Sequence, residues 1–142
     1  MDFVKKYLYE KIKTKKKSKQ FKNMYSFDER KVESFRIKTK YPDRAPVIVE
    51  RAGGNNITLL EKKKYLVPFE LTIGEFMLLI RKKIKLDPRT GMYLFFNDNI
   101  LVACSETIGD SYNKYSDSDG FLYIKYSGEN TFGGKLKLFY II

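Results

Sequence analysis

The sequence predicts an α+β fold of the β-grasp type with an extra helix in front. Capped helical segments are expected at 27–39 and 73–84, and β-branched or apolar strand segments at 47–51, 63–68 and 92–96. A hairpin that is followed by a helix and then by further strands, in a short chain, is typical of a sheet that wraps around one helix. The 142 residues are 43% hydrophobic and 15% aromatic, which is enough for one core. We therefore expect a single domain with tails.

The beginning of the chain is a basic extension. Residues 1–23 hold nine lysines against Asp2 and Glu10, a net charge of +7 out of +11 for the whole chain. The apolar residues of this extension recur near the helical period, which favours a short amphipathic helix; they are Phe3, Val4, Tyr7, Leu8 and Ile12. The run Lys15–Lys17 instead favours a solvated linker, because adjacent like charges repel and leave no apolar face to bury. The pattern leaves an ordered helix and a disordered extension both open.

The first helix of the domain is expected from Phe27 to Thr39. Ser26 can cap it, and Glu29 stands three residues later, as in a capping box. The proline-containing segment 41–46 ends the helix, because proline disfavours the helical conformation in the residue before it. Strand Val47–Arg51 follows, and it pairs with Lys63–Pro68 as a hairpin with a long loop.

The second half of the domain contains another helix and two more strands. Thr72 caps a helix that runs to Ile84, with apolar residues at helical spacing and a basic C-terminal end that suits the helix dipole. Met92–Phe96 is predicted as a central strand, because its residues are almost continuously apolar. A short helix over about Ser105–Tyr115, a turn over 117–120 and a last strand, Phe121–Tyr126, complete the order.

Composition excludes several function classes. The chain has one cysteine, Cys104, and no histidine, so an intrachain disulfide and any Cys-His or Ser-His catalytic pair cannot form. We expect Cys104 to be a partly buried structural residue in a reducing, cytoplasmic compartment. The scattered carboxylates and the lack of a phosphate-binding glycine loop predict that the protein is not an enzyme. We expect no catalytic residue, no cofactor and no metal site.

Three stretches of sequence are distinctive in their composition, order and separation. They read FDERKVESFRIKTKYPDRAPVIVERA, KKKYLVPFELTIGEFMLLIRKKIKL and DGFLYIKYSGENTFGG. In them the chain resembles the autophagy-related protein eight family, the ubiquitin-like modifiers that include the GABARAP group. The resemblance extends from about Phe21 to Gly133 and implies a ubiquitin-like β-grasp fold with additional N-terminal helices. It divides the chain into a basic extension (1–20), a ubiquitin-like domain (21–133) and a C-terminal propeptide tail (134–142).

The resemblance implies that the chain is processed and joined to lipid. A cysteine protease would cut after an aromatic-glycine pair, here Phe132-Gly133, and activating and conjugating enzymes would then join the new carboxylate to phosphatidylethanolamine. A residue without a Cβ can thread a narrow active site and place its carbonyl against a thiolate. Cleavage after Gly134 remains open, as does a turn at this glycine pair that leads to a final strand, Leu136–Ile142. The product would act in autophagosome formation, in the cytoplasm and on the autophagosome membrane.

The resemblance also implies a groove for short peptides of cargo receptors that carry an aromatic residue and, three positions later, an aliphatic one. The peptide would add to a strand edge and fill two pockets. The aromatic pocket maps to Glu33, Ile37, Pro46, Ile48, Lys64, Leu66 and Phe121. The aliphatic pocket maps to Tyr65, Val67, Pro68, Leu71, Phe76 and Leu79. Positive charge from Arg44, Lys62, Lys64 and Lys83 would attract acidic residues beside the motif. For most of the apolar members, plain core packing is the alternative interpretation.

Two other functions remain as alternatives. An unconjugated adaptor would keep the groove and the tail, and would bind membranes or cytoskeletal surfaces through its basic N-terminus. A nucleic-acid-binding module would use the lysines and interleaved aromatic residues of the extension, but this signal is only compositional, and nucleic acid is not an expected partner. Phe35, an aromatic residue where the family usually shows a charge, is expected to contact the aromatic residues of the extension.

Overall fold

The computed structural model describes residues 2–53, 57–97 and 100–128, with the backbone alone for 13–18. Five strands form one mixed sheet; they are β1 (Arg44–Arg51), β2 (Lys64–Pro68), β3 (Met92–Phe96), β4 (Ile100–Leu101) and β5 (Leu122–Gly128). Their order across the sheet is β2-β1-β5-β3-β4. Strands β1 and β5 are parallel neighbours at the centre, whereas the other pairs are antiparallel. The predicted hairpin is therefore confirmed as β1 and β2.

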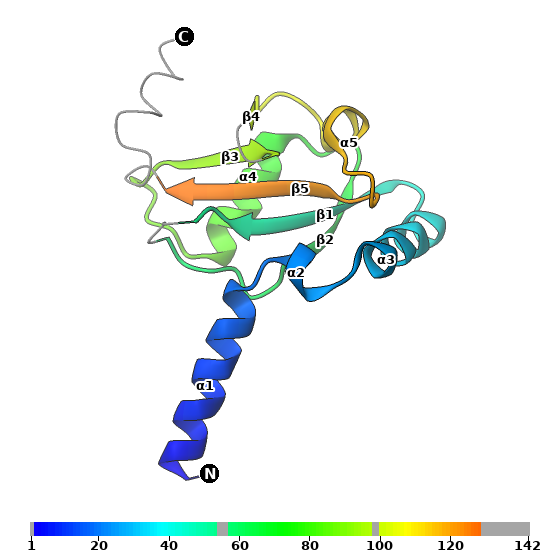
Figure 1. Ribbon diagram of the computed structural model, residues 1–142. Helices are drawn as coiled ribbons and strands as arrows, with labels where there is room; N and C mark the ends of the chain where they lie inside the picture. The colour runs from blue at the N-terminus through cyan, green and yellow to red at the C-terminus, as the bar shows by residue number, and fades with distance from the viewer. Residues whose placement is uncertain (1, 54–56, 98–99, 129–142) are drawn as a thin grey trace.

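Helices cover both faces of this sheet, and one further helix, at the N-terminus, projects from the domain (Figure 1). They are α1 (Phe3–Ser18), α2 (Phe21–Met24), α3 (Phe27–Lys40), α4 (Ile73–Lys83) and α5 (Ile108–Tyr115). Figure 1 shows α2 and α3 in front of the sheet, α4 crossing behind it and α5 at one end. A sheet that wraps around α4, with further helices in front, is the β-grasp arrangement that the sequence predicts.

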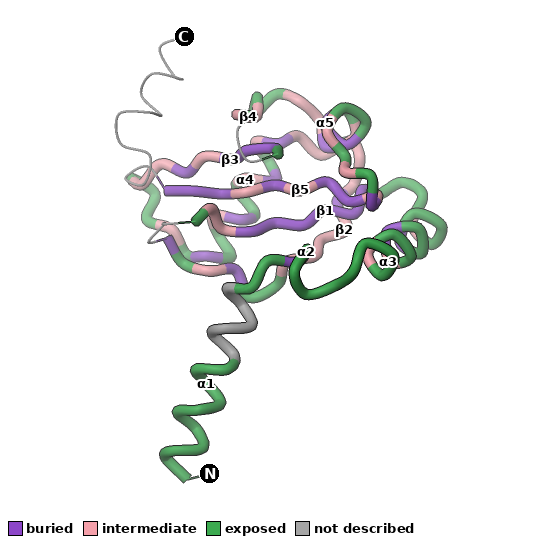
Figure 2. The backbone as a smooth tube through the Cα atoms, viewed as in Figure 1, coloured by how far each residue is buried: buried purple, intermediate pink, exposed green. Residues whose placement is uncertain are grey.

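Side-chain alternation along the strands creates two hydrophobic clusters, one on each face of the sheet. Val47 and Val49 of β1 pack with α4 and α5 in the larger cluster, whereas Ile48 between them packs under α2 and α3 in the smaller one. The same alternation holds in β5, where Leu122 faces the larger cluster and Tyr123 the smaller one. Both faces of the central strands are thus covered, and Figure 2 shows these strands as mostly buried.

The helix starts follow the capping residues of the sequence. Ser26 accepts a hydrogen bond from the Glu29 N–H, and the Glu29 carboxylate accepts one from the Ser26 N–H, which completes the predicted capping box. Thr72 forms the same arrangement with Glu75 at the start of α4. Helix α5 begins at Ile108, three residues later than predicted, because Thr107 is its cap and accepts from the Asp110 N–H.

Strand β1 begins three residues earlier than predicted and includes Pro46. Its pairing with β5 starts only at Val47, opposite Leu122. The Val49 N–H donates to the Lys63 carbonyl of the neighbouring chain segment, so alternate residues of β1, among them Val47, point their N–H groups to the β2 side. The missing N–H of Pro46 therefore falls on the β5 side, just before that ladder begins, where no bond is lost.

The N-terminal extension differs from two expectations. Helix α1 continues through Lys15–Lys17 to Ser18, so the expectation of a linker there is wrong. Phe35 is 71% exposed on α3 while α1 projects away from the domain, so the expected contact between them is also wrong. Helix α2 and the two-residue strand β4 are elements that the sequence did not predict.

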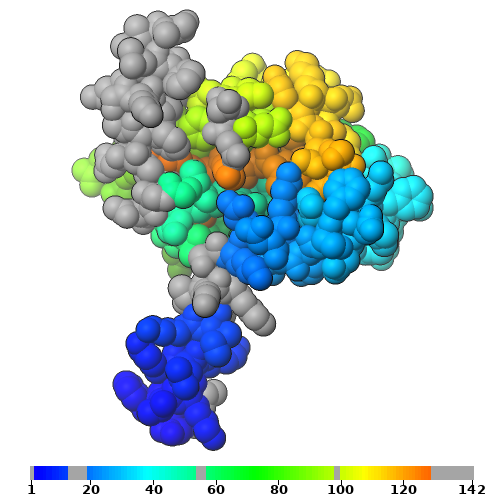
Figure 3. Space-filling model, viewed as in Figure 1, coloured from blue at the N-terminus to red at the C-terminus, as the bar shows by residue number. Residues whose placement is uncertain are grey.

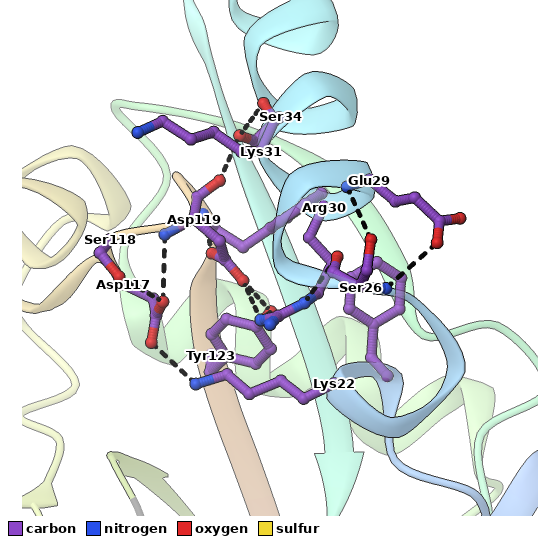
Figure 4. Close-up of polar contacts among 12 residues, drawn as sticks. Lys22, Ser26, Glu29, Arg30, Lys31, Ser34, Asp117, Ser118, Asp119 and Tyr123 are labelled. Carbon is purple, nitrogen blue, oxygen red and sulfur yellow. Dashed lines mark hydrogen bonds and ion pairs between the residues drawn. The ribbon is translucent and has the colours of Figure 1, made fainter.

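A buried acidic residue ties α3 to the turn that precedes β5. The Asp119 side chain is fully buried, and its carboxylate accepts hydrogen bonds from the Arg30 guanidinium at 2.6 Å and from the Phe121 N–H at 2.9 Å. The Ser34 hydroxyl donates to the Asp119 carbonyl, and a more exposed ion pair joins Lys22 to the same turn. Figure 4 shows these contacts converging from α2, α3 and the turn. The network holds the two front helices against the sheet.

This turn predicts a stability difference between two glycine substitutions. Gly120 has a φ of +90°, and a Cβ at this position would lie 2.3 Å from the Ser34 Oγ. We expect Gly120→Ala to lower the free energy of unfolding by about 2 kcal/mol or more, through backbone strain and steric overlap. Gly53→Ala is the matched control, because a Cβ there meets nothing within 4 Å. Urea denaturation of both variants checks this, and equal stabilities would contradict it.

Candidate functional site

Strand β2 lies at one end of the strand order and offers its outer edge for pairing. The Val49 N–H donates to the Lys63 carbonyl, and the Phe69 N–H donates to the Asp43 carbonyl. These two bonds show which residues of β1 and β2 direct their backbone groups towards each other. The odd-numbered residues of β2 therefore direct their backbone groups to β1. The N–H and carbonyl groups of Lys64 and Leu66 point the other way, to the outside of the sheet. Pro68 has no N–H, so Lys64 and Leu66 supply the outward donors of β2 and Pro68 can offer only its carbonyl.

The side chains of β2 divide between the two faces of the sheet. Leu66 packs against the small cluster under α2 and α3, whereas Tyr65 and Val67 pack with α4 in the large cluster. The candidate aromatic pocket thus lies on the α3 side of the β2 edge. The candidate aliphatic pocket lies on the α4 side.

On the α3 side, the innermost predicted residues form a closed floor. Ile37, Ile48 and Phe121 are at most 1% exposed and pack with Phe21, and Pro46 is also buried. A cleft of ≈ 710 Å³ opens beside this floor, between the front helices and the segment that leads into β2. Its lining residues are Phe21, Met24, Tyr25, Glu29, Arg30, Glu33, Glu61, Lys62, Lys63 and Lys64. Three residues of the predicted site, Glu33, Lys62 and Lys64, therefore line an open cleft.

One wall of this cleft, which α2 provides, was not predicted from the sequence. Phe21 lies with its ring centroid 5.0 Å from that of Tyr25 and 5.3 Å from that of Phe121. The Phe21 N–H donates to a Glu50 carboxylate oxygen at 2.8 Å, which fixes α2 on β1. The spacing of four residues between two aromatic side chains was the available signal for this turn of helix.

On the α4 side, the predicted residues range from core to surface. Val67 and Phe76 are 4% and 2% exposed, so the core-packing interpretation describes them well. The Tyr65 ring lies 6.1 Å from that of Phe76, nearly perpendicular to it. Leu79, one turn further along α4, is 47% exposed, and Pro68 and Leu71 are half-buried. These side chains leave an apolar surface next to β2 that a small aliphatic group can contact.

Basic side chains surround both parts of the site. Lys62 and Lys83 each place their Nζ 5.7 Å from the centre of the Tyr65 ring, and exposed Arg44 stands opposite Pro68 in the ladder. Burial raises the pKa of Tyr65 to about 12, so its hydroxyl stays protonated and donates to the Lys62 carbonyl at 2.8 Å. The rim is therefore positively charged and suited to acidic ligands.

Glu33 is the acidic member of the rim and is held between two cations. Its Oε1 lies 2.7 Å from the Arg36 guanidinium and 2.7 Å from the Lys64 ammonium. The Arg36 hydrogen bond and then the Lys64 hydrogen bond lower the pKa of Glu33 to about 2, against the opposing effect of partial burial. An acidic peptide residue would compete with Glu33 for Lys64.

Other predicted features lie outside the groove or outside the described residues. The lipid-conjugation residues Phe132 and Gly133, and the alternative Gly134, fall beyond residue 128, where the description ends. Cys104 is exposed rather than partly buried, because it lies in the loop before α5, where its carbonyl accepts from the Gly74 N–H. Within the described ranges, no cluster of His, Cys, Asp or Glu could hold a metal ion, and no helix is long and apolar enough to cross a membrane.

A mixed five-stranded sheet around one helix, with extra N-terminal helices, defines the ubiquitin-like class of protein. The family model described as "Autophagy protein Atg8 ubiquitin like" matches residues 29–133. The chain belongs to the Atg8 family of ubiquitin-like autophagy proteins. This confirms both the predicted fold class and the family resemblance.

Curated relatives and solved structures agree with this assignment. Autophagy-related protein 8 of Mycosarcoma maydis is 51% identical over 113 residues, which are 80% of this chain and 95% of that protein. Autophagy-related protein 8e of Arabidopsis thaliana is 50% identical over 113 residues, 80% of this chain and 92% of that protein. The crystal structure of Trypanosoma brucei ATG8 superimposes with a TM-score of 0.75 at 37% identity, covering 81% of this chain and 98% of that one. Plasmodium falciparum Atg8, solved in complex with a Plasmodium falciparum Atg3 peptide, superimposes with a TM-score of 0.71 at 37% identity, covering 77% and 95%.

The ion pairs of Glu33 predict a pH-dependent contribution to stability. A carboxylate with a lowered pKa in the folded state stabilises the fold above its ordinary pKa of 4.5, and this contribution is lost as the pH falls towards about 2. We expect Glu33→Gln to cost less than about 1 kcal/mol near pH 7, because the pairs are partly exposed, and to cost progressively less below pH 4.5. Urea denaturation between these pH values, with exposed Glu70→Gln as the control, measures the difference. A cost that does not depend on pH would contradict the assignment.

Proposed function

We propose that the chain is a modifier that is cut after Gly133 and joined to phosphatidylethanolamine, and that it acts in autophagosome formation. The match to the family model ends at residue 133, which supports Gly133 over Gly134 as the new terminus. The residues after it, 134–142, are then a propeptide that is lost on processing. Conjugation would take the protein from the cytoplasm to the autophagosome membrane.

In this function the protein is a substrate of enzymes rather than a catalyst. The chain contains no histidine that could activate its one cysteine. A processing cysteine protease would expose the Gly133 carboxylate, and activating and conjugating enzymes would carry it as a thioester. The Plasmodium falciparum Atg8 structure contains an Atg3 peptide, which supports a conjugating enzyme as a partner here. No cofactor and no nucleic acid are required.

The open edge of β2 is the observation that supports a peptide groove for cargo receptors. An extended peptide that pairs with Lys64 and Leu66 becomes a sixth strand of the sheet. Because side chains alternate along a strand, two anchors three positions apart point to opposite faces. An aromatic-x-x-aliphatic motif would thus send its first anchor to the α3 side and its second to the α4 side, where the two pockets lie. The alternation of side chains along a strand therefore accounts both for the three-residue spacing of the motif and for candidate pockets on opposite faces of the sheet.

The different burial of the predicted residues supports different roles for them in the groove. Because Ile37, Ile48 and Phe121 are closed over by Phe21, an aromatic anchor would enter the adjoining cleft, with Lys64 at its edge. Phe76 and Val67 would support the aliphatic pocket from the core, and exposed Leu79 would contact the ligand. Lys62, Lys83 and Arg44 would attract acidic residues on either side of the motif.

Processing gives a direct prediction. We expect Gly133→Ala to abolish both cleavage and the lipid adduct, because the added methyl group obstructs the narrow protease channel. Gly134→Ala is the matched control and should leave a species that ends at Gly133 and carries one phospholipid. Intact mass of the protein from the membrane fraction of its own cells distinguishes these products. Full-length chain alone, under conditions that induce autophagy, would favour the unconjugated adaptor instead.

The groove gives a second prediction, independent of conjugation. Leu79 and Leu78 are neighbouring exposed leucines of α4, at 47% and 61%, but only Leu79 belongs to the candidate pocket. We expect Leu79→Ala to weaken binding of an acidic aromatic-x-x-aliphatic peptide roughly tenfold, through lost apolar contact, and Leu78→Ala to leave it unchanged. Fluorescence polarisation measures the affinity of both the wild type and the Leu79→Ala form for this peptide and for a peptide whose aliphatic anchor is replaced by alanine. The four affinities form a double-mutant cycle. Additive effects of the two changes would place the anchor elsewhere.

A further inference from the structure

Helix α1 supplies none of the candidate groove residues and none of the residues that line the cleft beside β2. It lies outside residues 29–133, which the family model matches, and the relatives named above align to about four-fifths of this chain. Figures 1 and 3 show α1 projecting from the domain as a separate rod. Its 16 residues span about 24 Å at 1.5 Å per residue.

One half of the circumference of α1 is apolar and in contact with solvent. At 3.6 residues per turn, this half carries Phe3, Val4, Tyr7, Leu8 and Ile12. The exposed fractions of these side chains run from 51% for Leu8 to 82% for Phe3. Exposing a contiguous set of apolar side chains to water is unfavourable, and such patches mark interaction sites. A partner surface is therefore expected to cover this half of α1.

The remainder of α1 is strongly basic. The helix contains seven lysines and one acidic residue, Glu10. Lys5 and Lys6 stand opposite the apolar half, and Lys11, within it, places its ammonium 5.2 Å from the centre of the Tyr7 ring. A long lysine side chain can lie along apolar surface while its charge reaches outward. The partner surface must therefore combine an apolar interior with negative charge.

The C-terminal end of α1 is joined to the domain by a short connection. Only Lys19 and Gln20 separate α1 from α2, and Phe21 is buried with its N–H bonded to Glu50, which is itself paired with Lys63 at 3.2 Å. Whatever surface α1 binds is consequently held close to the sheet and its groove.

We propose that α1 binds anionic lipid bilayers directly, with its apolar half in the boundary between headgroups and acyl chains and its lysines on acidic headgroups. A nucleic acid would satisfy the lysines and could stack on Phe3 and Tyr7, but it would leave the aliphatic side chains of Val4, Leu8 and Ile12 in water. A second copy of α1 would bring two sets of seven lysines together, which like-charge repulsion opposes. An anionic bilayer satisfies both halves of the helix. This contact precedes the lipid link at Gly133 and then adds to it as a second anchor.

Co-sedimentation of the purified, unconjugated full chain with phosphatidylcholine vesicles, with and without phosphatidylserine, tests the proposal. We expect binding to the anionic vesicles alone, weakened by salt. Replacing Lys5, Lys6 and Lys11 with glutamine should weaken it roughly 100-fold, whereas glutamine at the exposed domain residues Lys40, Lys82 and Lys85 makes the same change in net charge with little effect. The substitutions Phe3→Ala, Leu8→Ala and Ile12→Ala together should weaken it more than about tenfold at unchanged charge and without loss of helix propensity.

Tryptophan fluorescence tests the orientation of the helix, because the chain contains no tryptophan. We expect the emission of Leu8→Trp to shift to shorter wavelength on adding anionic vesicles, and that of Tyr9→Trp, on the opposite side of α1, to shift much less. Equal shifts would overturn the proposal, as would absent or charge-independent vesicle binding, tighter binding to RNA than to vesicles, or dimerisation through α1 without lipid. Because no conjugating enzyme is present, none of these results depends on Gly133.

Discussion

The parallel pairing of β1 with β5 at the centre of the sheet is the contact on which the rest of the structure depends. Both strands have neighbours on each side, and six consecutive residues of β1 are buried. Parallel central strands of this kind need cover on both faces. Helix α4 covers one face and α2 with α3 covers the other, so the chain must supply helices before and after the first hairpin. The β2 edge is left at the border of both layers, so the peptide proposed to bind there would reach both candidate pockets.

Covering the front face requires polar contacts as well as apolar ones. The small cluster is built from Phe21, Ile37, Ile48 and Phe121, with Leu66 and Tyr123 at its border. The Arg30–Asp119 ion pair closes the end of this layer. Its two charged groups lie 2.6 Å apart, and the side chains of Arg30 and Asp119 are 11% and 0% exposed. A buried pair of this kind gives the front helices a defined position, because separating the two charges would leave Asp119 uncompensated. The wall of the cleft therefore depends on a buried ion pair whose cation, Arg30, itself lines the cleft.

Charge is distributed so that the two proposed surfaces attract different ligands. The groove combines a few cations with Glu33, whose carboxylate holds Lys64 and Arg36 in place, and this arrangement suits short acidic peptides. Helix α1 combines dense positive charge with a mostly apolar half that Lys11 interrupts, and this combination suits an extended anionic bilayer. Helix α1 is joined to the domain two residues before Phe21, whose N–H donates to Glu50 of β1.

The sequence by itself determined the elements whose signals are local. The capping box of Ser26 and Glu29, the cap at Thr72 and the apolar run Met92–Phe96 specify hydrogen bonds or burial within a few residues, and each predicted element is present. The family motifs likewise determined the β-grasp class. Where a sequence pattern allowed two outcomes, only the tertiary structure decided between them. Phe76 and Leu79 have the same helical periodicity, yet only packing against Tyr65 buries the first and leaves the second at the surface. Phe21 forms a wall of the cleft because Glu50, 29 positions later, accepts its N–H, and no local pattern specifies a contact at that separation.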